Sequence, residues 1–396
     1  MSGKPGAIHG AAAKCQLILA NFEGGSINTR WQTRDYTIYT EGNCMLIFTN
    51  RTIADGTTAA AFSRAFTPGS QRLGVADVKA SGQGWKLSDI DTEVTDKDSL
   101  DLLLPLFQGE KPVLLYVHGN NNPPATCFGR MRDLEALYPD AALIGFSWPS
   151  EGFQSDGLPL PNLTAPATTS VDETDLGKIN AGNRAKGGIQ DKIRRFHQAQ
   201  TNAKDSVEAF ARLLRLIAAA RLQANRQPFS LAIHSLGAHL FQYSLPASGA
   251  TEAVGAAYNV ALLAPCVRAA AHKEWLERFR PKGRTYITYN KGDSVLFGAY
   301  IADGEQVKLG ADPGTDLVRS SGVRYISFTD AATNFGGHGY FVKNVNGKAK
   351  LLFSRIFCSQ ADYLHDESPK VVYPLDCDPS GTVCYMAVPK KPAEER

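Results

Sequence analysis

The chain has 396 residues, of which 43% are hydrophobic and 20% charged, and its formal net charge at pH 7 is +3. These values are typical of a soluble globular protein and exclude a disordered, fibrous or membrane-embedded chain. The small, scattered positive charge argues against a nucleic-acid partner. No run is apolar over the length that a transmembrane segment needs.

The N-terminal third is expected to be rich in short strands. Residues 1–14 are rich in Gly and Ala and lack the apolar core of a signal peptide, so we predict a flexible tail. The following residues contain short β-like runs separated by turn residues, which predict hairpins or edge strands: Gln16–Phe22, Asp35–Tyr39, Cys44–Thr49 and Leu73–Ala80.

From about residue 111 onward, apolar strand-like runs alternate with helical stretches. The predicted strands are Pro112–Val117, Ala142–Phe146, Phe229–Ile233, Tyr258–Leu263, Thr285–Tyr289 and Val323–Phe328. The predicted helices are Cys127–Tyr138, Ala203–Leu222, Ala238–Leu245 and His272–Phe279. This alternation predicts an α/β fold with a mostly parallel central sheet and helices on both faces. We expect one domain over residues 15–365, followed in 366–396 by a hairpin (Val371–Leu375, Val383–Val388) and a tail.

Residues 150–187 interrupt the alternation. They are rich in Pro, Gly, Ser, Thr and Asp and have little apolar periodicity. Loops this long inside a domain are usually lids, binding loops or mobile segments. We interpret the insertion as a partly ordered cap over the site, with a disordered surface insertion as the alternative. The basic cluster that follows it, Lys192, Arg194 and Arg195, is interpreted as a solvated helix face.

Ser235, in the run Ile233-His234-Ser235-Leu236-Gly237, is the candidate nucleophile. It lies between a predicted strand and a predicted helix, where a sharp turn would hold a serine above the sheet. Such a turn needs small residues on both sides of the serine. Gly237 meets this need, whereas Ile233 stands where a glycine is usual, and a β-branched side chain is poorly suited to so tight a position.

Backbone N–H groups for an oxyanion hole are expected from two places. One is Leu236, directly after the serine. The other is the loop His118-Gly119-Asn120-Asn121-Asn122 after the strand Pro112–Val117, where the glycine lets backbone approach a substrate closely. We assign the second donor to Asn120, with Asn121 as the alternative.

The general base must be a histidine that follows the serine in the chain. Of the eight histidines, six are excluded by their place in the tail, in the two motifs, on the helix after the serine, before the serine, or one strand too early: His9, His118, His234, His239, His197 and His272. Two remain. His338 lies among glycines after the last predicted strand, which is where an α/β sheet with the chain order Ser, acid, His places its base. His365 is interpreted as a helix-surface residue.

The acid that orients the base is expected between the serine and the histidine. Asp293 follows the penultimate predicted strand and is our choice, with Asp330 as the alternative. An Asx-turn or helix cap is the other interpretation of Asp293. The serine, the acid, the base and the oxyanion loop each follow a predicted strand, which is where open α/β sheets place their sites.

With these residues in view, the chain resembles a little-characterised bacterial family of the esterase/lipase (α/β-hydrolase) superfamily. Its members carry an H-G-x-N-N loop, an F-S-W-P strand end, an A-H-S-M-G elbow and a late G-H-x-Y, with T-N-R upstream. Here these correspond to His118–Asn122, Phe146–Pro149, Ile233–Gly237, Gly337–Tyr340 and Thr49–Arg51. The resemblance implies the hydrolase fold and a Ser-Asp-His triad. Cys266 departs from the family, because many members have an aspartate there.

The predicted activity is hydrolysis of a carboxylic ester through an acyl-enzyme on Ser235, Asp293 and His338. The same triad also serves lipases, phospholipases, thioesterases and amidases, and a non-catalytic binding module of this fold is a further alternative. The expected partner is a small-molecule or lipid ester. No nucleotide-binding run such as G-x-G-x-x-G is present, and we expect no cofactor or metal.

The seven cysteines lack metal-ligand spacing. Cys377 and Cys384 flank the turn-like Asp378–Gly381 and could face each other across a hairpin, but we interpret them as free thiols. Free thiols are typical of a reducing compartment, so the sequence favours the cytoplasm.

Overall fold

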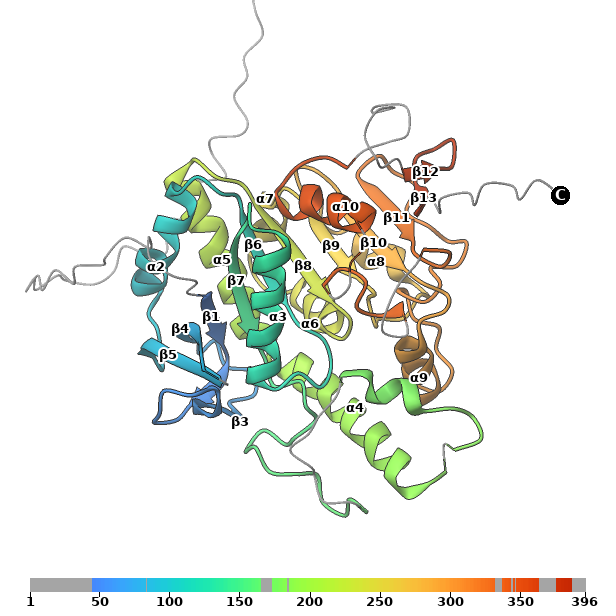
Figure 1. Ribbon diagram of the computed structural model, residues 1–396, viewed down its shortest axis with the longest axis horizontal. Helices are drawn as coiled ribbons and strands as arrows, with labels where there is room; N and C mark the ends of the chain where they lie inside the picture. The colour runs from blue at the N-terminus through green and yellow to red at the C-terminus, as the bar shows by residue number, and fades with distance from the viewer. Residues whose placement is uncertain are drawn as a thin grey trace, which may run out of the picture. The chain divides into compact units, whose positions relative to one another are not determined.

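A mostly parallel sheet runs through the computed structural model, which describes residues 45–82, 84–164, 173–183, 185–331, 337–342, 345, 347–362 and 375–386 (Figure 1). The chain divides into two units, and all the described residues lie in the second, Glu41–Arg396. Within them eleven strands join in the order β12-β13-β11-β10-β9-β8-β6-β7-β1-β4-β5. Their bounds are β1 Met45–Thr49, β4 Gly74–Ser81, β5 Gly84–Asp91, β6 Val113–Val117, β7 Ala142–Ser147, β8 Phe229–His234, β9 Val260–Leu263, β10 Thr285–Tyr289, β11 Val323–Ser327, β12 Leu375–Cys377 and β13 Val383–Met386. A separate pair is formed by β2 Arg51–Ile53 and β3 Phe62–Phe66.

The strands from β1 across to β13 pair in parallel, and antiparallel pairs occur at the two edges. Every residue of β6, β8, β9, β10 and β11 is buried. Helices on both faces explain this, because a parallel strand covered on both sides must be apolar almost throughout. The predicted α/β fold, with a mostly parallel central sheet and helices on both faces, is therefore confirmed. Each strand predicted between residues 44 and 328 is present within about two residues of its expected bounds. The predicted strands Gln16–Phe22 and Asp35–Tyr39, and residues 371–374 of the predicted Val371–Leu375, lie outside the described residues.

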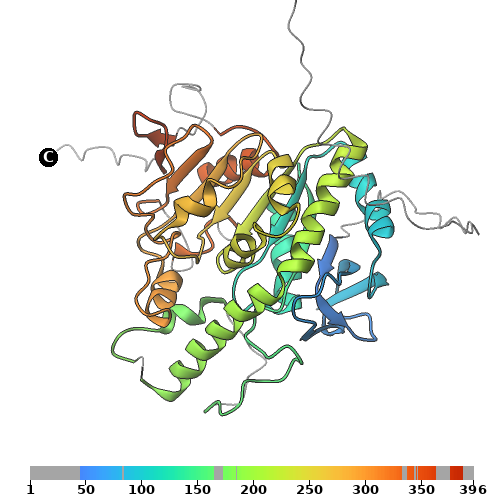
Figure 2. The ribbon, with the colours of Figure 1, turned by 180° about the vertical axis from the view of Figure 1, so that it is seen from behind.

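Two helical layers cover the sheet. Helices α3 (Pro124–Leu137) and α10 (Gly347–Phe357) lie in front of it in Figure 1, and α5 (Val207–Ala224) crosses the other face in Figure 2. Helix α5 packs against α2, α6 and α7. The remaining helices are α2 Asp96–Gln108, α4 Gly187–Asp205, α6 Gly237–Ser244, α7 Ala250–Ala256, α8 His272–Leu276 and α9 Ser294–Ala302, with short 3-10 turns η1 Ala59–Ala61 and η2 Glu173–Lys178. Among the described residues, no helix combines the length and the apolar character that crossing a membrane requires.

The predicted helix over Ala203–Leu222 is instead the end of α4 followed by α5, with a break at Ser206. Ser206 is buried. Its hydroxyl donates to the carbonyl of Asn202 in the preceding turn and accepts from the side-chain amide of Asn50. A serine hydroxyl bonded back onto the preceding turn commonly bends a helix. Periodicity alone does not reveal such a break.

The described part of the C-terminal segment forms a hairpin, in which β12 pairs antiparallel with β13, and β13 pairs in parallel with β11 of the main sheet. The prediction of free thiols at its base is wrong. Cys377 and Cys384 are directly paired across the two strands and form a disulfide. The prediction of a reducing compartment rested on free thiols, and this pair does not support it. The other cysteines described, Cys127, Cys266 and Cys358, are buried and unbonded.

The described part of the insertion packs closely on α9. Helix α9 contacts η2 over its length, and α4 runs beside both at one end of the sheet (Figure 1). Gly298 of α9 makes this approach possible, because a Cβ atom there would overlap the carbonyl oxygen of Leu176. Gly177 faces Ser294 in the same way, with 3.1 Å between its Cβ position and the Ser294 hydroxyl.

Replacing Gly298 by alanine tests this contact. Alanine normally stabilises a helix interior by about 0.5–1 kcal/mol relative to glycine. At Gly298 we expect the opposite sign, a loss of about 1–3 kcal/mol in the free energy of unfolding, because the methyl group is forced into backbone. Urea denaturation measures the difference. Gly188→Ala in α4 is the matched control, since its Cβ would meet nothing within 4 Å and should be neutral or stabilising. A Gly298→Ala protein as stable as the wild type would contradict the packing of η2 on α9.

Candidate active site

The residues singled out in the sequence gather at the carboxyl ends of neighbouring strands. The loop His118–Asn122 follows β6, Ser235 follows β8, and Asp293 follows β10. His338 lies beyond β11. Strands β6, β8, β9, β10 and β11 are consecutive in the sheet and parallel, so these segments emerge at the same edge. Parallel sheets commonly place their sites at this edge.

Ser235 occupies a strained turn between β8 and α6. Its φ is 51°, in the left-handed region that a non-glycine residue rarely adopts. The turn is held by three backbone hydrogen bonds: Ser235 donates to Leu263, and its carbonyl accepts from Ala238 and Cys266. Strain of this kind persists only where the surroundings enforce it, and it is concentrated at functional positions.

Two glycines leave room for the tight turn at Ser235, and neither of them is at position 233. A Cβ atom at Gly119 would lie 2.7 Å from the Cβ of Ser235, and one at Gly237 would lie 2.7 Å from the carbonyl oxygen of His118. Ile233, by contrast, is an ordinary buried residue of β8, paired with Val117 and Leu262. An isoleucine is tolerated there because the tight approach comes from the Gly119 loop instead.

The backbone N–H groups of Asn120 and Leu236 make no hydrogen bond to any described residue. Asn121, the alternative donor, is already engaged, because its N–H donates to the carbonyl of Ser150 at 2.9 Å. Asn122 donates its N–H to the Ser150 hydroxyl at 3.0 Å. Asn120, unlike Asn121, therefore has a backbone N–H without a partner among the described residues. Leu236 is the N-cap of α6, at the end of the helix where N–H groups have no helical acceptor.

His118 anchors the loop to Trp148. Its Nε2 accepts from the backbone N–H of Trp148 at 3.1 Å, and the indole N–H donates to the carbonyl of His118 at 2.9 Å. The two rings stack with centroids 5.6 Å apart. Since Nε2 accepts, Nδ1 carries the proton and donates to the carbonyl of Gly119. The H-G-x-N-N loop and the F-S-W-P strand end are thus one unit.

A buried ion pair holds the far side of this unit. Both guanidinium Nη atoms of Arg51 bond the carboxylate of Glu151, at 3.0 and 2.6 Å, and Nη2 also donates to the carbonyl of Trp148. Both side chains are almost completely buried. Arg195 of α4 donates to the backbone oxygen of Glu151 and to the side-chain oxygen of Asn121. Sequence reasoning missed Glu151 and Arg195, because their partners lie 44 to 100 residues away along the chain.

Asp293 both caps a helix and contacts His338, the two roles that its sequence context allowed. It is the N-cap of α9, where Oδ1 accepts from the N–H groups of Val295 and Leu296 at 3.0 Å each. Its Oδ2 accepts from Nδ1 of His338 at 2.7 Å. The proton on Nδ1 leaves Nε2 of His338 unprotonated in the neutral ring, which is the tautomer that a general base needs.

The segment that carries His338 is held by contacts just before and just after the histidine in the chain. Gly337 has φ 76°, and a Cβ there would overlap the side-chain amide of Asn290, which donates to the carbonyl of Gly337. The hydroxyl of Tyr340 bonds that of Thr288 at 2.7 Å. Asp330, the alternative acid, is exposed, and the alternative base His365 lies outside the described residues.

His338 lies against the residue that directly precedes Ser235. Its ring lies 4.8 Å, centroid to centroid, from the ring of His234, which directly precedes the serine. The Ser235 hydroxyl makes no hydrogen bond among the contacts between described residues, and its side chain is buried. In ligand-free enzymes a nucleophile–base hydrogen bond is often long and tightens when substrate binds.

Cys266 is an inert neighbour of the serine. Its N–H donates to the carbonyl of Ser235, and its own carbonyl accepts from Nε2 of His239. Burial raises the pKa of its thiol to about 12, so it carries no thiolate at neutral pH. An aspartate is not needed at this position for the contact between Asp293 and His338.

No metal ligand set is evident near these residues. Within the described ranges, no group of three or more His, Cys, Asp or Glu side chains is placed so as to hold a metal ion. The histidines that precede and follow the serine are buried, and both ring nitrogens of His239 have protein partners.

Three buried histidines are expected to make the free energy of unfolding decrease in acid. Burial lowers the pKa of His118 to about 3 and that of His239 to about 4, and it lowers the pKa of His234 well below its usual value of 6.5. Below pH 6.5 the unfolded chain therefore takes up protons that the folded chain does not. We expect the free energy of unfolding to fall as the pH drops from about 6.5 toward 4.

Urea denaturation at pH 7.5, 6.0 and 5.0 measures this dependence. Replacing His239 by glutamine should flatten the decline over this range, because one of the depressed groups is removed. A wild-type protein whose unfolding free energy stays constant from pH 7.5 to 5.0 would contradict the burial of these rings in neutral form.

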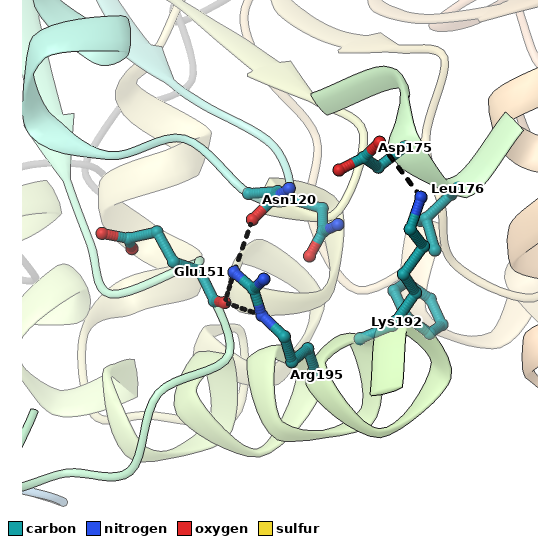
Figure 3. A pocket seen from close by; sticks show the side chains of 8 residues that line it. Asn120, Glu151, Asp175, Leu176, Lys192 and Arg195 are labelled. Carbon is teal, nitrogen blue, oxygen red and sulfur yellow. Dashed lines mark hydrogen bonds and ion pairs between the residues drawn. The ribbon is translucent and has the colours of Figure 1, made fainter. Parts of the chain in front are cut away.

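A pocket opens beside Asn120 (Figure 3). It is partly open to solvent and is lined by Asn120, Asn121, Glu151, Asp175, Leu176, Lys192, Arg195 and Phe196. Helix α4 and the insertion supply most of its wall. The prediction of a solvated helix face for the basic cluster is therefore wrong for Lys192 and Arg195, which are half-buried in this wall. A polar pocket beside the oxyanion loop is a place where part of a substrate can bind.

A family model described as an alpha/beta hydrolase of unknown function (DUF900) matches residues 104–355, more than half of the chain. The matched region contains the loop after β6, the turn at Ser235, and both Asp293 and His338. No curated protein and no solved structure matches the chain. The match agrees with the resemblance that the sequence motifs indicated.

Proposed function

Since the chain belongs to this family of α/β-hydrolases of unknown function, we propose that it is a serine hydrolase that cleaves carboxylic esters. The proposal assigns the nucleophile to Ser235, the base to His338 and the orienting acid to Asp293. The observation that carries it is the bond from Nδ1 of His338 to Asp293, at the same sheet edge as a serine with φ 51°. A packing role alone requires neither the bond nor the strained turn.

The proposed reaction begins when Nε2 of His338 accepts the proton of the Ser235 hydroxyl as the oxygen attacks the ester carbonyl. The imidazolium that forms is stabilised by Asp293. Negative charge on the carbonyl oxygen is met by the N–H groups of Asn120 and Leu236. The tetrahedral intermediate expels the alcohol, which takes the proton from His338, and leaves an acyl-enzyme on Ser235. Water then gives a proton to His338 and attacks the acyl carbon; the bond to the Ser235 oxygen breaks, the carboxylic acid leaves, and His338 returns the proton to Ser235.

We further propose that the insertion serves as the roof of the substrate pocket. Leu176 of η2 lines the pocket beside Asn120, and η2 packs on α9, whose N-cap is Asp293. If η2 moved away, the pocket would open and the loop that carries Asn120 would become exposed to solvent. This arrangement supports a cap over the site, and the packing at Gly298 is where it can be loosened without changing a pocket residue.

Labelling with a fluorophosphonate probe tests the proposal directly. The purified full chain is incubated with the probe, and the modified peptide is identified by mass spectrometry. We expect one adduct, on the peptide that contains Ser235, and parallel loss of activity toward 4-nitrophenyl acetate and butyrate. An unlabelled folded protein with no ester hydrolysis would favour a non-catalytic binding module. Equal labelling of a Ser235→Ala protein would show that another residue is the nucleophile.

A further inference from the structure

The pocket beside Asn120 carries two cationic side chains on one face of α4. Lys192 and Arg195 are three residues apart, and residues at this spacing lie next to each other on a helix. Figure 3 shows Arg195 extending from α4 to the backbone of Glu151, beside Asn120, the proposed oxyanion donor, and Lys192 extending to Asp175. A ligand group in this pocket would therefore lie close to both charges and to the reacting carbonyl.

The carboxylates of the pocket are already matched by other cations. Both oxygens of Glu151 are bonded by Arg51, which lies behind the pocket wall. Asp175 accepts from Lys178 at 2.7 Å and from Lys192 at 3.2 Å. Burial raises and these two lysines lower the pKa of Asp175, with a net decrease, so it stays ionised.

Arg195 has no carboxylate partner among the described residues. Its bonds go to two neutral oxygens, the backbone carbonyl of Glu151 and the side chain of Asn121, and they use Nε and Nη2. Nη1 makes no hydrogen bond to a described residue. Burial lowers the pKa of Arg195, which reflects loss of water around a charge that no anion directly contacts.

Cations surround the two carboxylates of this pocket. Arg51 bonds both oxygens of Glu151, and Lys178 and Lys192 share Asp175, so neither carboxylate is hydrogen-bonded to Arg195. Arg64 and Asp191 also lie near Arg195, and their opposite charges cancel. Half-buried, uncompensated cations are stabilised by an anion that brings its own hydrogen-bond acceptors.

We propose that this pocket binds a carboxylate group of the ester substrate, held by Lys192 and Nη1 of Arg195, so that the preferred substrate is an anionic ester. The inference rests on the proposed function and names its substrate class. Leu176 and Phe196 provide apolar wall for the short carbon chain between the carboxylate and the scissile ester. The carboxylate can belong to the acyl part or to the alcohol part of the ester.

Two matched substrate pairs distinguish these sources. For the acyl part, mono-4-nitrophenyl glutarate is compared with 4-nitrophenyl valerate, which has a methyl group in place of the carboxylate. For the alcohol part, 4-acetoxybenzoate is compared with 4-acetoxytoluene. We expect kcat/KM for the anionic member of one pair to exceed that for the neutral member by about tenfold, which is what one charge-assisted hydrogen bond supplies. Equal rates within both pairs would overturn the proposal.

Lys192→Gln is the decisive variant, because Lys192 contacts Asp175 and does not support the oxyanion loop as Arg195 does. It should reduce the preference for the anionic ester about tenfold. Lys204→Gln is the control: it removes the same charge from the exposed end of the same helix, about 18 Å away along the axis. If Lys204→Gln reduces the preference as much as Lys192→Gln, long-range attraction rather than a pocket contact is responsible, and the proposal fails.

Binding of glutarate separates failure of this inference from failure of the proposed function. Isothermal titration calorimetry with glutarate needs no turnover, so it decides the question even for a chain that cleaves no ester. We expect binding that Lys192→Gln weakens and Lys204→Gln leaves unchanged. If the wild type hydrolyses neutral esters and neither binds glutarate nor prefers an anionic ester, the hydrolase assignment stands and the anion pocket is wrong.

Discussion

Replacing Ser235 by alanine is expected to lower kcat for the best nitrophenyl ester by about 10⁵- to 10⁶-fold, which is the loss seen when a triad serine is removed. The physical reason is the loss of the hydroxyl oxygen that is proposed to form the acyl-enzyme. The fold should persist, although alanine retains the strain at φ 51°. Stopped-flow and steady-state absorbance assays measure the rate of ester hydrolysis, and circular dichroism verifies the fold.

A double replacement shows whether Ser235 and His338 act as one unit. His338→Gln alone should cost nearly as much as Ser235→Ala, and the double variant should cost little more than either, because a triad fails when any essential member is missing. Effects that multiply would show that the two residues act independently. A Ser235→Ala protein with more than about a tenth of wild-type activity would refute the proposed mechanism, since a triad serine is worth far more than that.

Replacing Arg51 by methionine is expected to lower the free energy of unfolding by about 3–5 kcal/mol, because it leaves the buried carboxylate of Glu151 without a partner. The same change releases the carbonyl of Trp148 and, through it, the loop that carries Asn120. Ester hydrolysis should therefore fall as well, even at temperatures where the variant is folded. Urea denaturation measures the first effect, and steady-state kinetics the second.

The Arg51→Met, Glu151→Leu double variant separates charge from packing. Removing both charges should restore much of the lost stability, because a buried pair replaced by apolar groups is often nearly neutral. The exposed pair Lys97–Asp101 is the control, and Lys97→Ala should change stability by less than about 1 kcal/mol. If Arg51→Met is no more destabilising than Lys97→Ala, the Arg51–Glu151 pair does not hold the loop in solution.

The sheet was predictable because its signal is local. Strands such as β6 and β8 are buried on both faces, so each appears in the sequence as an apolar run of strand length. Helices α4 and α9 were not predicted, for opposite reasons. Helix α4 presents a narrow apolar stripe amid polar residues, whereas α9 is apolar nearly all round and shows no helical period.

The candidate site was predictable where chain order carries the information. Ser235, Asp293 and His338 follow strands β8, β10 and β11, in the chain order that an α/β-hydrolase places its triad, so their positions selected them. The supports of the oxyanion loop were not predictable. The pairing of Arg51 with Glu151, and the approach of Arg195 to Asn121, join residues 74 to 100 positions apart, and no sequence spacing encodes such contacts. The same holds for the pocket, whose wall exists only after α4 and the insertion are in place.

Asp293 caps α9 with one carboxylate oxygen and bonds His338 with the other, and this has a consequence for the evolution of the family. A descendant that lost its enzymatic activity would still be selected to keep an aspartate there, because losing a helix cap costs about 1 kcal/mol. An aspartate at this position in a relative is therefore poor evidence of activity. The Ser235 hydroxyl has no such second hydrogen bond to a described residue, so drift should replace a serine in the left-handed region with glycine or asparagine once catalysis is no longer selected. The residue that occupies position 235 is thus the better guide to which descendants remain enzymes.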